Sequence, residues 1–146
     1  MRLVVYVLLV AGFSACWASF KPIYNDVEKA KADRMVAQFH ELYNESRFEE
    51  MYALLDDSMR ATVNKEQHMA SLKQVYEKWG KVRDSRVSEA RVFPGNPIQI
   101  RAIYNTQFEK GQGQEWFTCN IHGEEARLMN YTNGEGFDKP NQNKTP

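Results

Sequence analysis

Apolar residues recur at helical spacing through the first half of the chain. In the segment 29–44 they fall on one face, which predicts an amphipathic helix. A shorter stripe predicts a second helix with apolar positions from 48 to 55, with 56–58 as its end region and a loop or turn over 59–63. A third helix is expected between Asn64 and Gly80, because asparagine can cap a helix start and glycine adopts the left-handed conformation of a helix end.

After Gly80 the pattern changes to the alternation with period two that is typical of strands. The first predicted strand has an irregular alternation that indicates a bulge. Because the later strands are joined by short turns, neighbouring strands are expected to be antiparallel and in sequential order. Helices followed by hairpin-linked strands predict an α+β fold, with three N-terminal helices packed on roughly four antiparallel strands. The predicted strands span 82–93, 98–108, 116–122 and 126–132.

The N-terminus has the layout of a secretory signal. Arg2 precedes the uncharged apolar run Leu3–Phe13, which is too short to span a bilayer. Phe13-Ser14-Ala15-Cys16 resembles a bacterial lipoprotein box, which implies cleavage before Cys16 and a diacylglycerol on its sulfur. The resemblance implies a cell-envelope protein on the periplasmic side of a bacterial membrane, with the outer membrane favoured. The alternative is cleavage after Ala18, which would release a soluble secreted protein.

The length and composition favour one globular domain. The chain has 146 residues, of which 42% are hydrophobic and 26% charged. Its 19 basic and 19 acidic residues balance, which argues against a nucleic-acid partner. The predicted organisation is a signal peptide over 1–15, a tether over 16–27, one domain over 28–132 and a disordered tail over 133–146.

Several short motifs follow one another from the end of the third predicted helix onward. They are Trp79-Gly80-Lys81-Val82, Ser85-Arg86, Pro94-Gly95-Asn96-Pro97, Tyr104, Phe108-Glu109-Lys110, Glu115, Gly123 and Tyr131. In this order they resemble exported bacterial domains of unknown function in the nuclear transport factor 2-like superfamily. The resemblance covers about 28–132 and implies a cone-shaped fold, in which helices pack into a strongly curved antiparallel sheet. The sequence departs from this group at Glu124–Arg127, and the family supplies no catalytic residue.

No catalytic or metal-binding constellation stands out in the sequence. His40 borders the apolar face of the first predicted helix, and a half-buried structural role is favoured over that of a general base. Asp56-Asp57 is interpreted as a helix end, because adjacent side chains on a helix diverge. No two histidines have close metal-ligand spacing, so no metal, cofactor or catalytic residue is expected.

The sequence also predicts the positions of two sets of apolar residues and of one cysteine. Cys119 is interpreted as a small buried hydrophobe. Five aromatic residues are expected to converge between helices and sheet, as core or as a pocket for a small apolar ligand: Tyr43, Tyr76, Trp79, Tyr104 and Phe117. On the opposite sheet face a homodimer surface is expected from Ile103, Trp116, Met129 and Tyr131, since cones of this type commonly dimerise there.

Two functions remain open at this point. The first is a non-catalytic, lipid-anchored envelope protein whose domain binds a partner protein or a small apolar ligand. The alternative is a cone-fold enzyme, isomerase- or dehydratase-like, that moves a proton on a small hydrophobic substrate. A filled interior would favour the first, and an open cavity with a desolvated acid or imidazole facing Tyr104 would favour the second.

Overall fold

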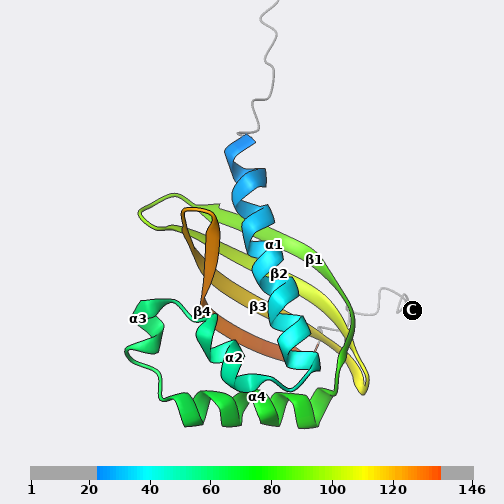
Figure 1. Ribbon diagram of the computed structural model, residues 1–146. Coiled ribbons are helices and arrows are strands. Elements are labelled where there is room, and N and C mark those ends of the chain that lie inside the picture. The colour runs from blue at the N-terminus through cyan, green and yellow to red at the C-terminus, as the bar shows by residue number, and fades with distance from the viewer. Residues whose placement is uncertain (1–22, 136–146) are drawn as a thin grey trace, which may run out of the picture.

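The fold is an α+β arrangement in which helices precede and cover one curved antiparallel sheet, as predicted. The computed structural model describes residues 23–135; the predicted signal peptide, Cys16 and the part of the predicted tail beyond 135 lie outside the described residues. Figure 1 shows α1 running across one face of the sheet, with α2 and α4 below it. The elements are α1 (Ile23–Asn44), α2 (Phe48–Ala53), α3 (Asp57–Arg60), α4 (Lys65–Trp79), β1 (Val82–Phe93), β2 (Ile98–Phe108), β3 (Gly111–His122) and β4 (Glu125–Glu135).

The first helix begins earlier than the sequence predicts. α1 starts at Ile23, inside the segment 16–27 that is predicted to be a tether. The Lys31 ammonium donates to the Glu28 carboxylate and, at 2.8 Å, to the carbonyl of Gly123 in the β3–β4 turn. These buried contacts hold this part of α1 against the sheet, and the helix itself includes 23–27 of the predicted tether.

The residues after α2 form more structure than the predicted helix end and loop. Asp56 instead caps the one-turn helix α3, because its side chain accepts from the Ser58 amide. Just before it, Leu55 forms a parallel bridge with Leu128 of β4. The amide of Asp56 donates to the Leu128 carbonyl, and the amide of Leu128 donates to the Leu54 carbonyl, each at 2.8 Å. The chain therefore covers part of the free edge of β4.

Both predicted ends of α4 are confirmed. The Asn64 side chain accepts from the Gln67 amide at 2.9 Å. Gly80 has φ 72°, and a Cβ there would lie 2.7 Å from a Glu109 carboxylate oxygen. Both the backbone conformation and the crowding require glycine at the exit from α4.

The sheet is sequential and antiparallel, in the order β1-β2-β3-β4. β1 carries register shifts near Val82 and Val87, which confirms the predicted bulge. β3 and β4 are longer than expected, and β4 includes 133–135 of the predicted tail. The Trp79 indole N–H donates to Asn133 at 3.2 Å, so α4 and the end of β4 hold each other.

Candidate functional site

The described residues contain one concentration of polar side chains deep between α1 and the sheet. Glu115 of β3 is only 1% exposed, and we call the group around it the Glu115 cluster: Glu115, His40, Thr106, Tyr131 and Ser85. His40 Nε2 lies 2.8 Å from Glu115 Oε2, and the Thr106 hydroxyl donates to the same oxygen at 2.6 Å. The Tyr131 hydroxyl donates to Oε1 at 2.9 Å. Both oxygens of this buried carboxyl group thus have protein partners.

Strand alternation places this cluster on the inner face of the sheet. Glu115 precedes Phe117 and Cys119 at intervals of two, and all three are buried. Thr106 lies on the neighbouring strand β2 and receives a hydrogen bond from Ser85 of β1 at 2.8 Å, because its own proton goes to Glu115. The strand predicted over 116–122 begins one residue after Glu115, so the sequence did not place Glu115 on the inner face, nor its neighbours on other strands beside it.

Two further tyrosines border the Glu115 cluster, and both stay neutral near neutral pH. Burial, followed by the nearby charge of Glu115, raises the pKa of Tyr43 well above its usual range. The Tyr43 hydroxyl is buried and has no hydrogen-bond partner within residues 23–135. Burial and then the hydrogen bond to Asp33 raise the pKa of Tyr104 in the same direction. The interior therefore combines a carboxyl group, an imidazole and neutral hydroxyls, which is a set of groups able to hold or pass a proton.

The five aromatic residues expected to line a ligand pocket pack mainly against one another and their neighbours. Tyr43 meets Tyr76 edge-on at 5.2 Å between ring centres, and Tyr104 meets Phe117 at 5.5 Å. Trp79 packs against Phe108 at 5.3 Å. Tyr43, Trp79, Tyr104 and Phe117 are buried in the core, and Tyr76 is partly buried beside it. Their position between helices and sheet is as expected.

Only part of the set of residues expected to form a homodimer surface lies together on the outer face of the sheet. Ile103 and Trp116 are direct cross-strand partners on the outer face of the sheet. They line a shallow hollow of about 250 Å³, together with Phe93 and Arg101. Tyr131 is not there, and its assignment to the outer face is wrong. A register shift near Thr118 turns this part of β4, so that Tyr131 opposes Phe117 and points toward Glu115.

Met129 is the other residue that the outer-face prediction misplaced. The register shift leaves Met129 without a ladder partner between Leu128 and Asn130. Its sulfur lies 3.7 Å from the Ser58 hydroxyl oxygen, so the side chain lies beside α3. A bulge is hard to place from sequence, and it reverses the face of every residue after it.

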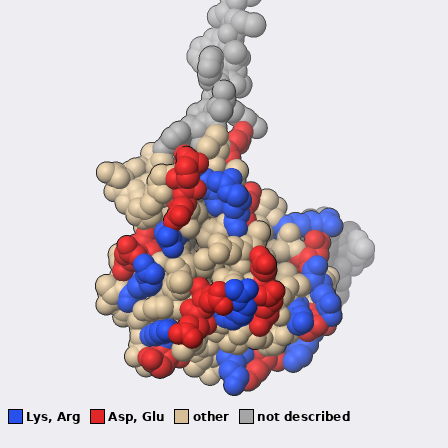
Figure 2. Space-filling model, in the orientation of Figure 1, with Lys and Arg blue, Asp and Glu red and all other residues tan. Residues whose placement is uncertain are grey.

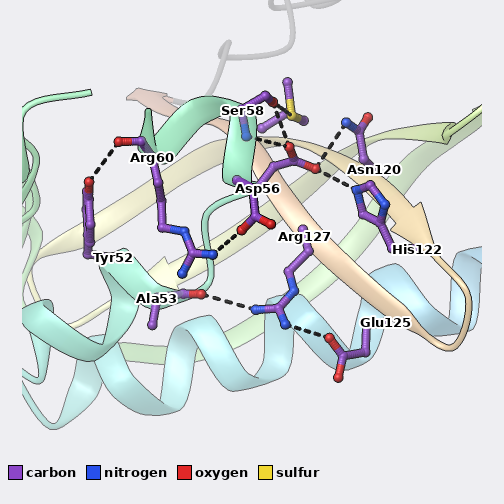
Figure 3. Close-up of polar contacts among 11 residues, drawn as sticks. Tyr52, Ala53, Asp56, Ser58, Arg60, Asn120, His122, Glu125 and Arg127 are labelled. Carbon is purple, nitrogen blue, oxygen red and sulfur yellow. Dashed lines mark hydrogen bonds and ion pairs between the residues drawn. The ribbon is translucent and has the colours of Figure 1, made fainter. Parts of the chain in front are cut away.

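A second polar group, which we call the Asp56 clasp, joins α3 to the end of β3 (Figure 3). One carboxylate oxygen of Asp56 accepts from the amide and hydroxyl of Ser58, at 3.0 and 2.6 Å. The other lies 2.7 Å from His122 Nε2 and accepts from the Asn120 amide group at 3.2 Å. Although burial raises the pKa of Asp56, these hydrogen bonds lower it to about 2. The predicted Asp56-Asp57 helix end is thus a buried hydrogen-bonding centre.

A wide groove lies on the helix side, between α1, α2 and the start of β4. Its volume is about 740 Å³, and its floor includes Met35, Leu42 and Leu54. Charged residues of both signs form the rim, among them Arg34, Glu41, Glu50 and Arg127. Figure 2 shows such acidic and basic side chains intermixed over this face. Neither this groove nor the outer-face hollow is lined by His40 or Glu115.

The remaining expectations concern metals, membranes and thiols. Within residues 23–135 no three His, Cys, Asp or Glu side chains gather as a metal site would require. None of the helices in that same range has the length and apolar character needed to cross a bilayer. Cys119 is a free, buried thiol, which confirms its interpretation as a small hydrophobe. Cys16 lies outside the described range.

Comparisons with known proteins reveal similarity at the level of fold. No protein-family model and no curated protein matches the sequence. The solved structure of Bd1075 from Bdellovibrio bacteriovorus superposes with a TM-score of 0.51 at 12% identity, over 77% of this chain and 42% of that one. The present chain therefore spans less than half the length of that protein. A candidate scytalone dehydratase from Novosphingobium aromaticivorans gives a TM-score of 0.47 at 11% identity, over 79% of this chain and 91% of that one. At this identity the likeness to Bd1075 concerns the fold alone.

Proposed function

We propose that this protein is an exported, lipid-anchored envelope protein whose domain binds a partner protein without catalysing a reaction. The groove between α1, α2 and β4 carries this proposal. Its buried apolar floor can accept side chains, and its rim of both charge signs suits the polar rim of a protein interface. A small apolar ligand would contact the floor but not that charged rim, so a protein segment that meets both fits better.

The interior gives a second reason to favour binding over catalysis. Each oxygen of Glu115 already has a donor from the protein itself, and His40 Nε2 is engaged with one of them. Neither hollow described above opens onto these groups. A substrate would have to displace packed aromatic rings before it could exchange a proton with Glu115.

Export and anchoring rest on the first residues of the sequence. The short apolar run ending at Phe13 and the small residues before Cys16 support cleavage and lipidation. The intact mass of the protein extracted from membranes tests this, and a mature chain that begins at Cys16 with added acyl chains is expected. An unmodified chain beginning at Ser19 would instead indicate secretion in soluble form.

The groove is tested by crosslinking inside cells. A photoreactive amino acid at Gln38, which lines the groove, should give one discrete adduct, and the same amino acid at the exposed Lys73 of α4 should give none. Reversing the rim charge with Arg127→Glu should remove the adduct, whereas Lys73→Glu should leave it. Equal adducts from both positions would show that the groove is not the binding surface.

A second candidate function is acid–base catalysis in the interior, and the buried contact between His40 and Glu115 favours it. This function requires the interior to open for a small hydrophobic substrate. Ring resonances of His40 can be followed by NMR while small ketones are added. A ketone that shifts them and is converted by the parent protein, but not by Glu115→Gln, would replace the binding proposal with an enzyme.

A further inference from the structure

One end of the molecule gathers the start of α1, the β1–β2 turn and the β3–β4 turn, and we call it the tether end. Lys31 near the start of α1 donates to Gly123 of the β3–β4 turn at 2.8 Å. Ile98 and Ile121 pair across β2 and β3, which brings the β1–β2 turn beside the same turn. Figure 1 shows both turns on the side from which α1 begins, with α4 at the far end.

The tether end carries most of the exposed large apolar side chains of residues 26–135. Val27 of α1 is 49% exposed, and Phe93, at the entry to the β1–β2 turn, is 38% exposed. The turn residues that follow, 94–97, are exposed as well. The third such side chain, Val87, is in the middle of β1 and 49% exposed. An aromatic side chain at the tip of a hairpin is an unfavourable contact with water unless something covers it.

Phe93 is accompanied by two cations. The Arg101 guanidinium lies over the Phe93 ring at 4.6 Å, and Arg91 is the direct cross-strand partner of Arg101. An aromatic ring with arginines beside it suits the headgroup region of a bilayer. There the ring can contact the apolar acyl chains, and the lipid phosphates accept hydrogen bonds from the guanidinium groups. Acids at this end offset part of the charge, since Glu124 pairs with Lys31 and Glu89 pairs with Arg91. A balanced end of this kind requires no anionic lipid.

We propose that the tether end docks on the surface of a phospholipid bilayer, with Phe93 inserted at headgroup level. The inference rests on the proposed anchor at Cys16 for its setting. Residues 17–22 are the six positions between that anchor and α1. Even fully extended, they span about 20 Å. So short a link keeps the tether end close to the membrane at a high effective concentration. A membrane contact that is too weak to hold an untethered domain is then populated.

The experiment uses the mature chain held at residue 16 by a histidine tag, in place of Cys16, on nickel-chelating lipid in phosphatidylcholine vesicles. This attachment makes the result independent of natural lipidation, which the intact mass tests separately. An environment-sensitive fluorophore is attached at Pro94→Cys in the β1–β2 turn, with Asn96→Cys as a second label site. Cys119 is buried and does not compete for the label. Lys73→Cys on α4 provides the far-end control.

The fluorophore at residue 94 should show blue-shifted emission. External dithionite should also chemically reduce this fluorophore several-fold more slowly than the fluorophore at residue 73. Phe93→Ser should abolish this protection, whereas Val87→Ser, which also removes an exposed apolar side chain from β1, should leave it. Equal quenching of the labels at 94 and 73 would overturn the docking proposal even if the intact mass shows acyl chains. Protection at 94 with an unmodified natural N-terminus would leave docking supported and remove the lipid anchor.

Discussion

The imidazole of His40 in α1 and the carboxyl group of Glu115 in β3 are 2.8 Å apart, although 75 positions separate them along the chain. The contact ties the first helix to the middle of the sheet. Glu115 is 1% exposed, so water does not replace a lost partner. The polar interior is therefore part of what holds the helix layer in place.

Glu115→Gln should destabilise the fold. The amide keeps the size of the side chain but presents one N–H₂ group to donors that need an acceptor. We expect a loss of about 2–4 kcal/mol in the free energy of unfolding, measured with urea. Glu124→Gln, at a side chain that is 89% exposed, is the matched control and should change little. Equal stability of the two variants would show that the Glu115 cluster has no energetic role.

Two tyrosine-to-phenylalanine substitutions should change the free energy of unfolding by amounts that differ in sign or size. Tyr43 has a buried hydroxyl without a partner, so Tyr43→Phe removes an unsatisfied group and should be neutral or stabilising. Tyr131→Phe removes the donor to Glu115 Oε1 and should cost about 1–2 kcal/mol. Thermal unfolding of the two variants measures the difference. A loss at Tyr43 as large as that at Tyr131 would indicate a partner for Tyr43, such as a buried water.

Protonation of Asp56 should lower the free energy of unfolding at acidic pH. Burial opposes its ionisation, yet the hydrogen bonds from Ser58, His122 and Asn120 lower its pKa from 3.8 to about 2. Because the folded pKa lies below the unfolded one, this contribution is complete above about pH 4 and is lost as the pH falls toward 2. Its size is about 2 kcal/mol.

The measurement is the free energy of unfolding between pH 5 and pH 2. Asp56→Asn keeps a capping side chain for α3 but has no charge to titrate. Its stability should therefore fall less steeply in this range than that of the parent protein. Parallel slopes for the two proteins would mean that Asp56 titrates no differently in the folded state.

Cys119 should be inert in the folded protein. Burial, and next the charge of Asp33, raise its pKa to about 12, and the thiolate is the reactive form. A thiol reagent at pH 8 should leave Cys119 unmodified in the native state and modify it after unfolding in urea. Rapid native-state labelling at residue 119, checked by peptide mass, would show that this part of β3 opens readily.

The local elements of the fold could be predicted from the sequence because their signals are local. Asn64 and Gly80 bound α4 by capping and by a left-handed backbone, each of which involves neighbouring residues only. The alternation along 98–108 places Tyr104 and Phe108 inward through the pleat of one strand. The short turns then impose the sequential antiparallel order.

The functional geometry could not be predicted in this way. Tyr131 was placed on the wrong face because a bulge in the β3–β4 pairing turns it inward, and a bulge depends on both strands at once. Asp56 looked like a helix end because its partners His122 and Asn120 lie 66 and 64 positions away. The sequence by itself determined which long segments are helices and strands, since periodicity and caps are properties of contiguous residues. Only the tertiary structure decided which polar groups meet, because burial and hydrogen bonding depend on distances between residues far apart in the chain.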